Sequence, residues 1–139
     1  MQISAKTDYA CKALLELALH WPKKEPLQIN AIAERQKIPI KFLTQILIFL
    51  KQMGLTQSVR GKRGGYLLAV APDKIRLSEI YQNLGNMAAF SGAPKQKKHV
   101  FTAIWQEIDA MVWREMEKIT FEDIANRTRR MDQAVNFEI

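Results

Sequence analysis

The sequence predicts a mainly helical fold with one small β-hairpin. Residues 28–52 contain two segments of helical apolar periodicity joined by a short turn, and residues 54–70 place strand-type residues around a run of glycines. Residues 100–119 repeat apolar side chains at helical spacing over a much longer stretch. Two short helices followed by a hairpin are typical of a winged helix-turn-helix, which places one helix in a DNA groove. We therefore expect a winged helix-turn-helix domain followed by a long dimerisation helix.

Composition is that of an ordinary globular protein. The chain has 139 residues, 47% hydrophobic and 25% charged, with no apolar run near the length of a membrane span. Its first residues lack the basic and apolar leader of a signal peptide. Cys11 is the single cysteine, which excludes an internal disulfide and a cysteine cage for a metal. We expect a cytoplasmic protein without membrane association.

The positive charge is confined to one half of the chain. Residues 1–77 hold 13 Lys and Arg against 5 Asp and Glu, a balance of +8, whereas residues 78–139 hold 8 against 9, a balance of −1. The excess therefore coincides with the helix-turn-helix pattern. A polyanion would be attracted there through counterion release, so this asymmetry favours a nucleic-acid partner.

The first helix is predicted from Ser4, a suitable N-cap, to a stop at Pro22. One face carries small and apolar side chains at three- and four-residue steps: Ala10, Ala13, Leu14, Leu17, Ala18 and Trp21. Lys6, Tyr9 and Lys12 lie off or beside that stripe and are candidate phosphate contacts. The alternative is an ordinary solvated helix face.

The second helix is expected over residues 28–36, with Ile32 and Ala33 facing inward. In this motif it braces the next helix and meets the DNA backbone through its amino end. Gln28 and Asn30, near that end, are candidate phosphate contacts.

The third helix, residues 39–52, has two opposite faces. Its apolar stripe of Leu43, Ile46, Leu47 and Leu50 belongs to the core. The other face presents one cation, a hydroxyl, an amide and an apolar side chain, at Lys41, Thr44, Gln45 and Ile48. Such side chains read base edges in a major groove, although they also suit a plain solvent face. Phe42 and Phe49 lie on the flank and are interpreted as packing residues.

The wing is predicted from strands over residues 56–60 and 66–70, joined by Gly61-Lys62-Arg63-Gly64-Gly65. The glycines allow a tight backbone, and the spacing excludes a phosphate-binding P-loop. Arg60 and Arg63 are the candidates for insertion into a narrow minor groove, or alternatively for phosphate pairing. The candidate DNA contacts of the wing are Ser58, Arg60, Gly61, Lys62, Arg63, Gly64, Gly65 and Tyr66.

The chain then continues through a short helix over residues 75–84 that ends near Gly85. Residues 86–98 have no periodicity and predict a loop that is either functional or mobile. After the long helix, Thr120-Phe121-Glu122-Asp123 resembles a capping box that opens a final short helix. Arg127, Arg129 and Arg130 are expected to lead into a frayed polar tail.

The long helix, residues 100–119, carries more apolar surface than a peripheral helix needs. Its candidate interface residues are Phe101, Ile104, Trp105, Ile108, Met111, Val112, Met116 and Ile119. We interpret this band as a helix–helix seam between two subunits. The alternative is that it packs only onto its own domain.

Several of these stretches resemble the IscR-type (Rrf-two) family of bacterial winged-helix regulators over nearly the whole chain. The matching stretches include Ser4 to Leu17, Ile32-Ala33-Glu34-Arg35-Gln36, Gly54-Leu55, Arg60-Gly61, Gly64-Gly65-Tyr66-Leu67-Leu68, Trp105 and Ile119-Thr120-Phe121. The resemblance implies a homodimer on a roughly palindromic operator, with the long helix at the dimer interface. It also implies DNA contacts from Lys41, Thr44, Gln45 and the wing.

One departure from the family concerns its cofactor. Many members hold an iron–sulfur cluster through three cysteines in the loop before the long helix, and residues 86–100 contain none. His99 stands about where the last of those cysteines falls, and Asp8 where some relatives recruit a ligand, but a cluster requires thiolates. His99 is interpreted as a solvated loop residue. We expect no cofactor and no metal site.

Taken together, the sequence predicts a DNA-binding domain over residues 1–84, a sensing-type loop without cysteines over residues 85–99, and dimerisation and C-terminal helices over residues 100–139. The expected function is homodimeric, sequence-specific regulation of transcription on double-stranded DNA, with an unidentified regulatory protein or small molecule as a further partner. The alternative is an interaction module that docks on a partner protein. The chain shows no catalytic constellation and is not expected to be an enzyme.

Overall fold

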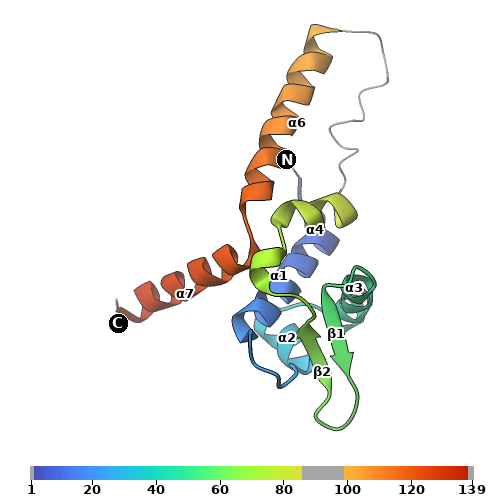
Figure 1. Cartoon of the computed structure of the whole chain (residues 1–139), viewed down its shortest axis with the longest axis vertical. Helices are drawn as coiled ribbons and strands as arrows, with labels where there is room; N and C mark the ends of the chain where they lie inside the picture. Colours follow the sequence, from blue (N-terminus) through green and yellow to red (C-terminus); the bar gives the residue numbers. More distant parts are fainter. Residues whose placement is uncertain (1, 86–98, 138–139) are drawn as a thin grey trace.

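The structure is a computed structural model that describes residues 2–85 and 99–137, and it is mainly helical with one hairpin (Figure 1). A head of packed helices carries the hairpin at one end, and α6 projects from the other end. The elements are α1 (Ala5–His20), α2 (Ile29–Gln36), α3 (Ile40–Gln52), β1 (Thr56–Val59), β2 (Gly65–Leu68), the 3-10 turn η1 (Pro72–Lys74), α4 (Leu77–Leu84), α6 (Val100–Lys118) and α7 (Phe121–Phe137). No helix within the described ranges is long and apolar enough to cross a membrane.

The core of the head is built around α1, which contacts α2, α3, α4, α7 and β2. Ala10 and Ala13 are completely buried, and their small side chains let neighbouring helices approach closely. Leu14 of α1 and Leu43 and Leu47 of α3 fill the centre of this core. The predicted stripe is therefore confirmed, except that Trp21 lies just beyond the helix and is 39% exposed.

The turn between α2 and α3 has the sharp geometry of a helix-turn-helix. Lys37 takes up a left-handed conformation (φ 53°) and ends α2, with its backbone N–H donating to the carbonyl of Ala33. Ile38 is buried beneath the turn, and Pro39 precedes α3 without needing a backbone N–H. Both predicted helices are confirmed within one residue at each end.

The wing is an antiparallel hairpin in which Thr56 pairs with Leu68 and Val59 with Gly65. Its strands are shorter than the predicted ones. Leu27 bridges to Tyr66 on the other side of β2 through two backbone hydrogen bonds of 2.8 and 3.0 Å. A Cβ on Gly65 would fall on the carbonyl of Leu27, so glycine is needed there for the two backbones to meet.

The junction of the head with α6 and α7 is held by backbone hydrogen bonds. Leu77 N–H donates to Ile119 at 2.9 Å, and Phe121 N–H donates to Ile75 at 2.9 Å. Ile75 was predicted to lie in the short helix, but it precedes α4 as an extended, fully buried residue. Its carbonyl accepts the hydrogen bond from Phe121. The two helices after residue 99 therefore leave the head from a fixed point.

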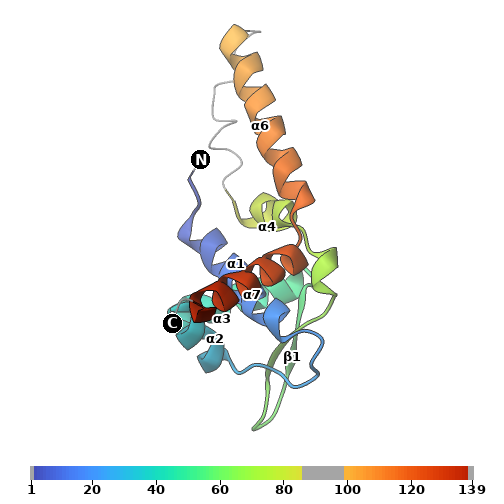
Figure 2. The same cartoon turned by 90° about the vertical axis from the view of Figure 1, so that its left-hand side faces the viewer.

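The prediction of a short final helix with a frayed tail is wrong. The helix α7 runs to Phe137 and includes Arg127, Arg129 and Arg130. It extends sideways from the head in Figure 1 and lies in front of α1 in the turned view of Figure 2. The capping box is confirmed, since Thr120 N–H donates to the Asp123 carboxylate at 3.0 Å and Asp123 N–H donates to the Thr120 hydroxyl at 3.1 Å. Phe121 and Ala125 anchor the first turns in the core, which the polar composition of the rest of the segment had obscured.

Candidate nucleic-acid interface

The outer face of α3 presents the side chains predicted to read bases. Lys41 and Gln45 are exposed, and Ile48 is 48% exposed. The hydroxyl of Thr44 donates to the carbonyl of Ile40 at 2.9 Å, which leaves its methyl group and oxygen lone pairs for a ligand. This face therefore offers a cation at Lys41, an amide donor and acceptor at Gln45, an acceptor oxygen at Thr44 and the apolar surface of Ile48.

The amino end of α1 lies beside this face. Lys6 Nζ stands 5.5 Å from the centroid of the Phe49 ring, and the rings of Tyr9 and Phe42 stack at 6.3 Å. These contacts hold a hollow of about 400 Å³ open between the two helices. Its lining consists of Ala5, Lys6, Tyr9, Phe42, Gln45 and Ile46.

Phe42 is a residue whose exposure sequence reasoning missed. It was interpreted as a packing residue, but half of its surface is exposed beside Gln45. Phe49 is half-buried, in agreement with a packing role. Phe42 lies next to the polar face of α3, where an aromatic ring can contact a thymine methyl.

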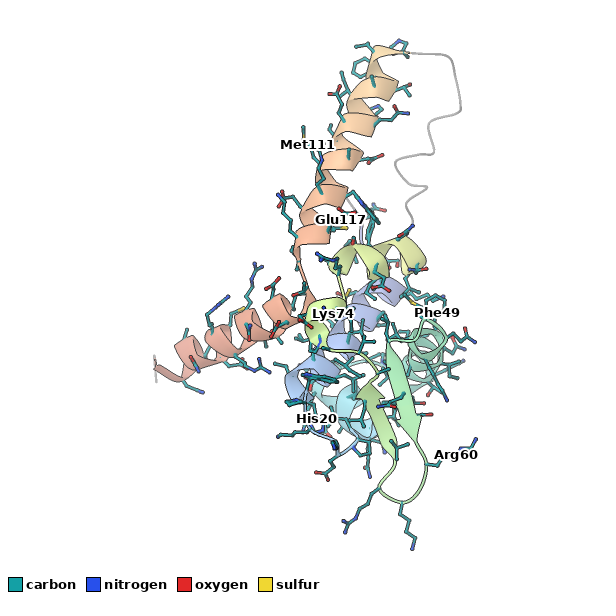
Figure 3. The ribbon with its side chains drawn as sticks, viewed as in Figure 1. His20, Phe49, Arg60, Lys74, Met111 and Glu117 are labelled. Carbon is teal, nitrogen blue, oxygen red and sulfur yellow. The ribbon has the colours of Figure 1, made fainter. Side chains whose placement is uncertain are left out.

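The wing carries its cations at the tip. Arg60, Lys62 and Arg63 are exposed, and Figure 3 shows Arg60 pointing away from the hairpin. Ser58 accepts a hydrogen bond of 2.9 Å from Lys51 Nζ, which brings a further cation, unforeseen in the sequence, from the end of α3 to the edge of β1. The wing and α3 thus form one basic surface.

The remaining wing residues have a different place. Gly61 has a φ of 117°, which an L side chain rarely adopts, and a Cβ on Gly64 would collide with the Val59 carbonyl. Tyr66 is half-buried against the core and bonded through its backbone to Leu27. These residues shape the hairpin, and their predicted DNA contacts remain predictions.

Gln28 lies directly after the bridge from Leu27 to the wing. It is the exposed N-cap residue of α2, and its side chain makes no capping hydrogen bond. A helix amino end with an exposed amide side chain suits a phosphate. The structure thereby places Gln28 near β2, although the two are separated by more than thirty residues in the sequence.

The cations of this surface are not neutralised by neighbouring carboxylates. Within residues 2–85 and 99–137 the ion pairs are Lys12 with Asp8, Arg35 with Glu16, and Lys118 with Glu115. Of the cations predicted to contact DNA, Lys12 is paired in this way, whereas the others take part in none of these pairs: Lys6, Lys41, Arg60, Lys62 and Arg63. Their charge is therefore available to phosphates.

The residues considered for a cluster do not fit one. Cys11 is partly buried, and burial together with the Asp8 carboxylate raises the pKa of its thiol to about 11, which disfavours a thiolate. Asp8 pairs with Lys12 at 2.7 Å. The described residues contain no group of three or more His, Cys, Asp or Glu side chains suited to a metal, and residues 86–98 have none of these residue types in their sequence.

His99 has a structural role that its interpretation as a loop residue missed. It is exposed and caps α6, with Nδ1 accepting a hydrogen bond of 3.2 Å from the Phe101 N–H. Its ring also stacks on Phe101 at 5.7 Å. These contacts give His99 a place in the first turn of α6.

The helix-turn-helix, the glycine-rich hairpin and the basic surface that joins them define a winged-helix DNA-binding regulator of transcription. Residues 3–127 match the family model of Rrf2, described as an iron-dependent transcriptional regulator, and the chain belongs to this family. The resemblance noted from the sequence is thus confirmed. The family consists of regulators, so the protein is not an enzyme.

Individual relatives agree with this membership. The IscR regulator of Cereibacter sphaeroides is 30% identical over 97% of this chain and 94% of its own length. The Synechocystis sp. protein slr0846, which carries the name of an HTH-type transcriptional regulator, is 49% identical over 58% of this chain, and the match spans only 54% of that protein.

Solved structures show the same fold. The structure of T. potens IscR superposes with a TM-score of 0.79 at 30% identity, covering 92% of this chain and 88% of that one. CymR (YrzC), the global cysteine regulator of B. subtilis, superposes with a TM-score of 0.79 at 27% identity, covering 91% and 98%. The predicted fold class is confirmed.

Proposed function

We propose that the protein regulates transcription as a homodimer that binds a roughly palindromic operator without a cysteine-ligated iron–sulfur cluster. One observation carries the proposal: the same protomer presents an unneutralised basic surface on its head and an uncovered apolar face on its projecting helix. The first suits a duplex, and the second suits another copy of the chain.

The apolar face of α6 supports the dimer. Phe101, Trp105 and Met111 are 54%, 45% and 59% exposed, and Ile104 and Ile108 are each more than a third exposed. The rings of Phe101 and Trp105 stack at 6.2 Å, which holds a ready-made aromatic surface on the helix. A contiguous exposed apolar face of this kind marks an interaction site.

The proposed interface is narrower than the predicted one. Met116 is only 6% exposed within the protomer, and Val112 and Ile119 are half-buried. These three residues lie toward α4 and have less surface left for a partner. The seam is therefore proposed around Phe101, Ile104, Trp105, Ile108 and Met111.

On DNA, α3 would enter the major groove with Lys41, Thr44 and Gln45 toward base edges, while Arg60 and Arg63 of the wing would reach the adjacent minor groove or backbone. Lys6, Tyr9 and Gln28 would contact phosphates on either side. In a symmetric dimer the two recognition helices would meet equivalent half-sites.

The wing variants Arg60→Ala and Arg63→Ala test the DNA-binding surface. An operator is first obtained by genomic selection with the purified dimer, and affinity is then measured by fluorescence anisotropy. Each variant is expected to lose about 1–3 kcal/mol if its arginine makes a bidentate base contact. Arg130→Ala, which removes an exposed arginine of α7, is the matched control and is expected to bind normally.

The competing function, docking on a partner protein, makes a different prediction for salt. Operator affinity should fall steeply between about 50 and 200 mM salt if phosphates are contacted. Unchanged affinity in both wing variants together with insensitivity to salt would contradict the proposal. An anaerobic preparation with a visible spectrum and an iron assay tests the absence of a cluster on the same sample.

A further inference from the structure

A second cationic site lies between α4 and α6, remote from the wing. There a hollow of about 580 Å³ is lined by Arg76, Ser78, Arg114, Glu117 and Lys118. Figure 3 shows Glu117 on α6 just above α4, and Figure 1 places this junction at the end of the head away from the hairpin tip. The hollow is therefore separate from the proposed DNA surface.

Two arginines in this hollow lack carboxylate partners. Neither Arg76 nor Arg114 has a carboxylate oxygen within 4.0 Å among the described residues. Arg76 donates one N–H to the backbone carbonyl of Glu117, and Arg114 donates its Nε–H to the carbonyl of Ala110. Most of the donors on each guanidinium are left for a ligand.

The other charges in the hollow offset these arginines only in part, because the lining holds three cations and one carboxylate. Glu117 supplies the one carboxylate of the lining, and that group accepts a hydrogen bond from Trp113 Nε1. Lys118 pairs with Glu115 at 2.8 Å, which is a usual arrangement for a lysine in the last turn of a helix. The uncompensated positive charge therefore belongs chiefly to Arg76 and Arg114.

Backbone contacts fix the two sides of the hollow. Arg76 forms a β-bridge with Thr120, and the neighbouring Leu77 N–H bonds to Ile119. On α6, Arg114 and Glu117 lie about 120° and 180° around the helix from Ile108, the centre of the apolar face. A second copy of the chain on that face would leave the hollow open.

The geometry points to this hollow as a binding site for a small oxyanion ligand, a molecule that carries phosphate or carboxylate groups. Guanidinium groups bind such groups in a bidentate manner, and Arg76 and Arg114 both line this hollow. The nearly buried Ser78 forms part of the lining. A bound anion would join Arg76 of the head to Arg114 of α6.

That link gives the site a regulatory consequence, which rests on the proposed function. The angle at which α6 leaves the head sets the separation of the two heads in a dimer. An anion that joins the head to α6 would restrict this angle and change the fit to operator half-sites. The ligand would then act as an effector of DNA binding.

The test is isothermal titration calorimetry of the full chain with inorganic pyrophosphate and with citrate, at about 150 mM sodium chloride to screen weak surface binding. Pyrophosphate binding without citrate binding would assign a phosphate ligand, and the reverse a carboxylate ligand. Arg114→Gln and Arg76→Gln should each weaken binding roughly tenfold or more. Arg114 donates its Nε–H to Ala110 within its own helix, so its replacement should disturb the junction with the head less than that of Arg76. Arg130→Gln on α7 and Arg60→Gln on the wing are the controls and should bind within about twofold.

Absence of binding by both anions, or an equal loss in the Arg60→Gln control, would overturn this assignment. Operator binding is measured on the same samples without anion. A wild-type protein that binds its operator but neither anion contradicts only the second site, whereas one that binds an anion but no DNA contradicts the proposed function.

Discussion

The head and the projecting helix α6, here called the arm, differ in how far their apolar side chains are buried. In the head, Leu14, Leu43 and Ile80 have essentially no exposed surface. In α6, which the structure describes throughout, only Met116 is buried, while Phe101 and Trp105 at the far end remain about half exposed. The head has buried its core within one chain, and the arm has not.

We therefore expect that the fold of the head and the assembly through the arm can be lost independently of each other. A head with its own core should keep its fold when the arm is disturbed. In the proposed dimer the exposed apolar face of the arm would be buried by another copy of the chain, so its disturbance should alter assembly before it alters the fold. Variants placed in each region test whether the fold of the head and the assembly of the arm are independent.

The largest expected effect is that of Ile108→Asp in the centre of the apolar face. A buried charge at a symmetric seam occurs twice in each dimer, so the protein should become monomeric. Operator affinity should fall by roughly a hundredfold or more, because each head would bind alone without the gain from a linked second site. Light scattering after size exclusion gives the mass, and anisotropy gives the affinity.

Gln106→Asp is the matched control for this variant. Gln106 is also exposed on α6, but it lies about 160° around the helix from Ile108. It should leave both mass and affinity unchanged. A dimeric Ile108→Asp protein, or one whose head unfolds, would refute the separation of head and arm.

A smaller effect is expected from Gly65→Ala in the head. The added Cβ would meet the Leu27 carbonyl, and the backbone bonds between Leu27 and Tyr66 would have to move. Overpacking of this kind should lower the free energy of unfolding by about 1–3 kcal/mol. Urea denaturation measures it, and the mass of the assembly should stay that of the dimer.

Lys62→Ala at the wing tip removes a charge without changing the backbone of the hairpin, and so separates DNA affinity from stability. This exposed residue should change the unfolding free energy by less than about 0.5 kcal/mol. The variant should bind DNA more weakly only because the lysine charge has been removed. Equal stability of Gly65→Ala and Lys62→Ala would show that the bridge to Leu27 contributes little.

The sequence predicted best those features that depend on local spacing. The stripe of α3, the turn at Lys37 and the capping box at Thr120 each follow from residues within a few positions of one another, and all three lie where the pattern placed them. The candidate DNA contacts of α3 and the wing could be proposed for the same reason. The interface itself remains a prediction.

Features that depend on tertiary contact could not be predicted in this way. The single-residue bridge of Leu27 has no periodicity to detect. Arg76 and Arg114 line the same hollow only because Arg76, just before α4, bridges to Thr120, just after α6. The length of α7 was missed because its anchors, Phe121 and Ala125, lie at one end of an otherwise polar segment. Phe42 lies between the two faces of α3, where helical angle alone does not decide burial.

The smallest effect concerns Asp123, at the point where head and arm meet. The pKa of its carboxyl is lowered below the ordinary value of 3.8. The largest cause is the hydrogen bond from the Thr120 backbone, the next is the Thr120 hydroxyl, and the charges of Arg127 and Arg130 add smaller contributions. A carboxyl with a lowered folded pKa stabilises the fold above its unfolded pKa, and the contribution is lost as the pH falls through the folded pKa. The start of α7 should therefore weaken below about pH 4.

Circular dichroism of the wild type and of Asp123→Asn between about pH 6 and 3 measures this effect as a difference between two curves. The variant keeps an amide oxygen as acceptor but has no charge to lose, so its helical signal should start slightly lower and change less with pH. Curves that differ by a constant amount throughout would mean that the ionised carboxylate does not hold α7. Since α7 packs against α1, such a result would mean that the burial of Phe121 and Ala125 alone holds α7 in place. The junction would then depend on the core of the head and not on the capping box.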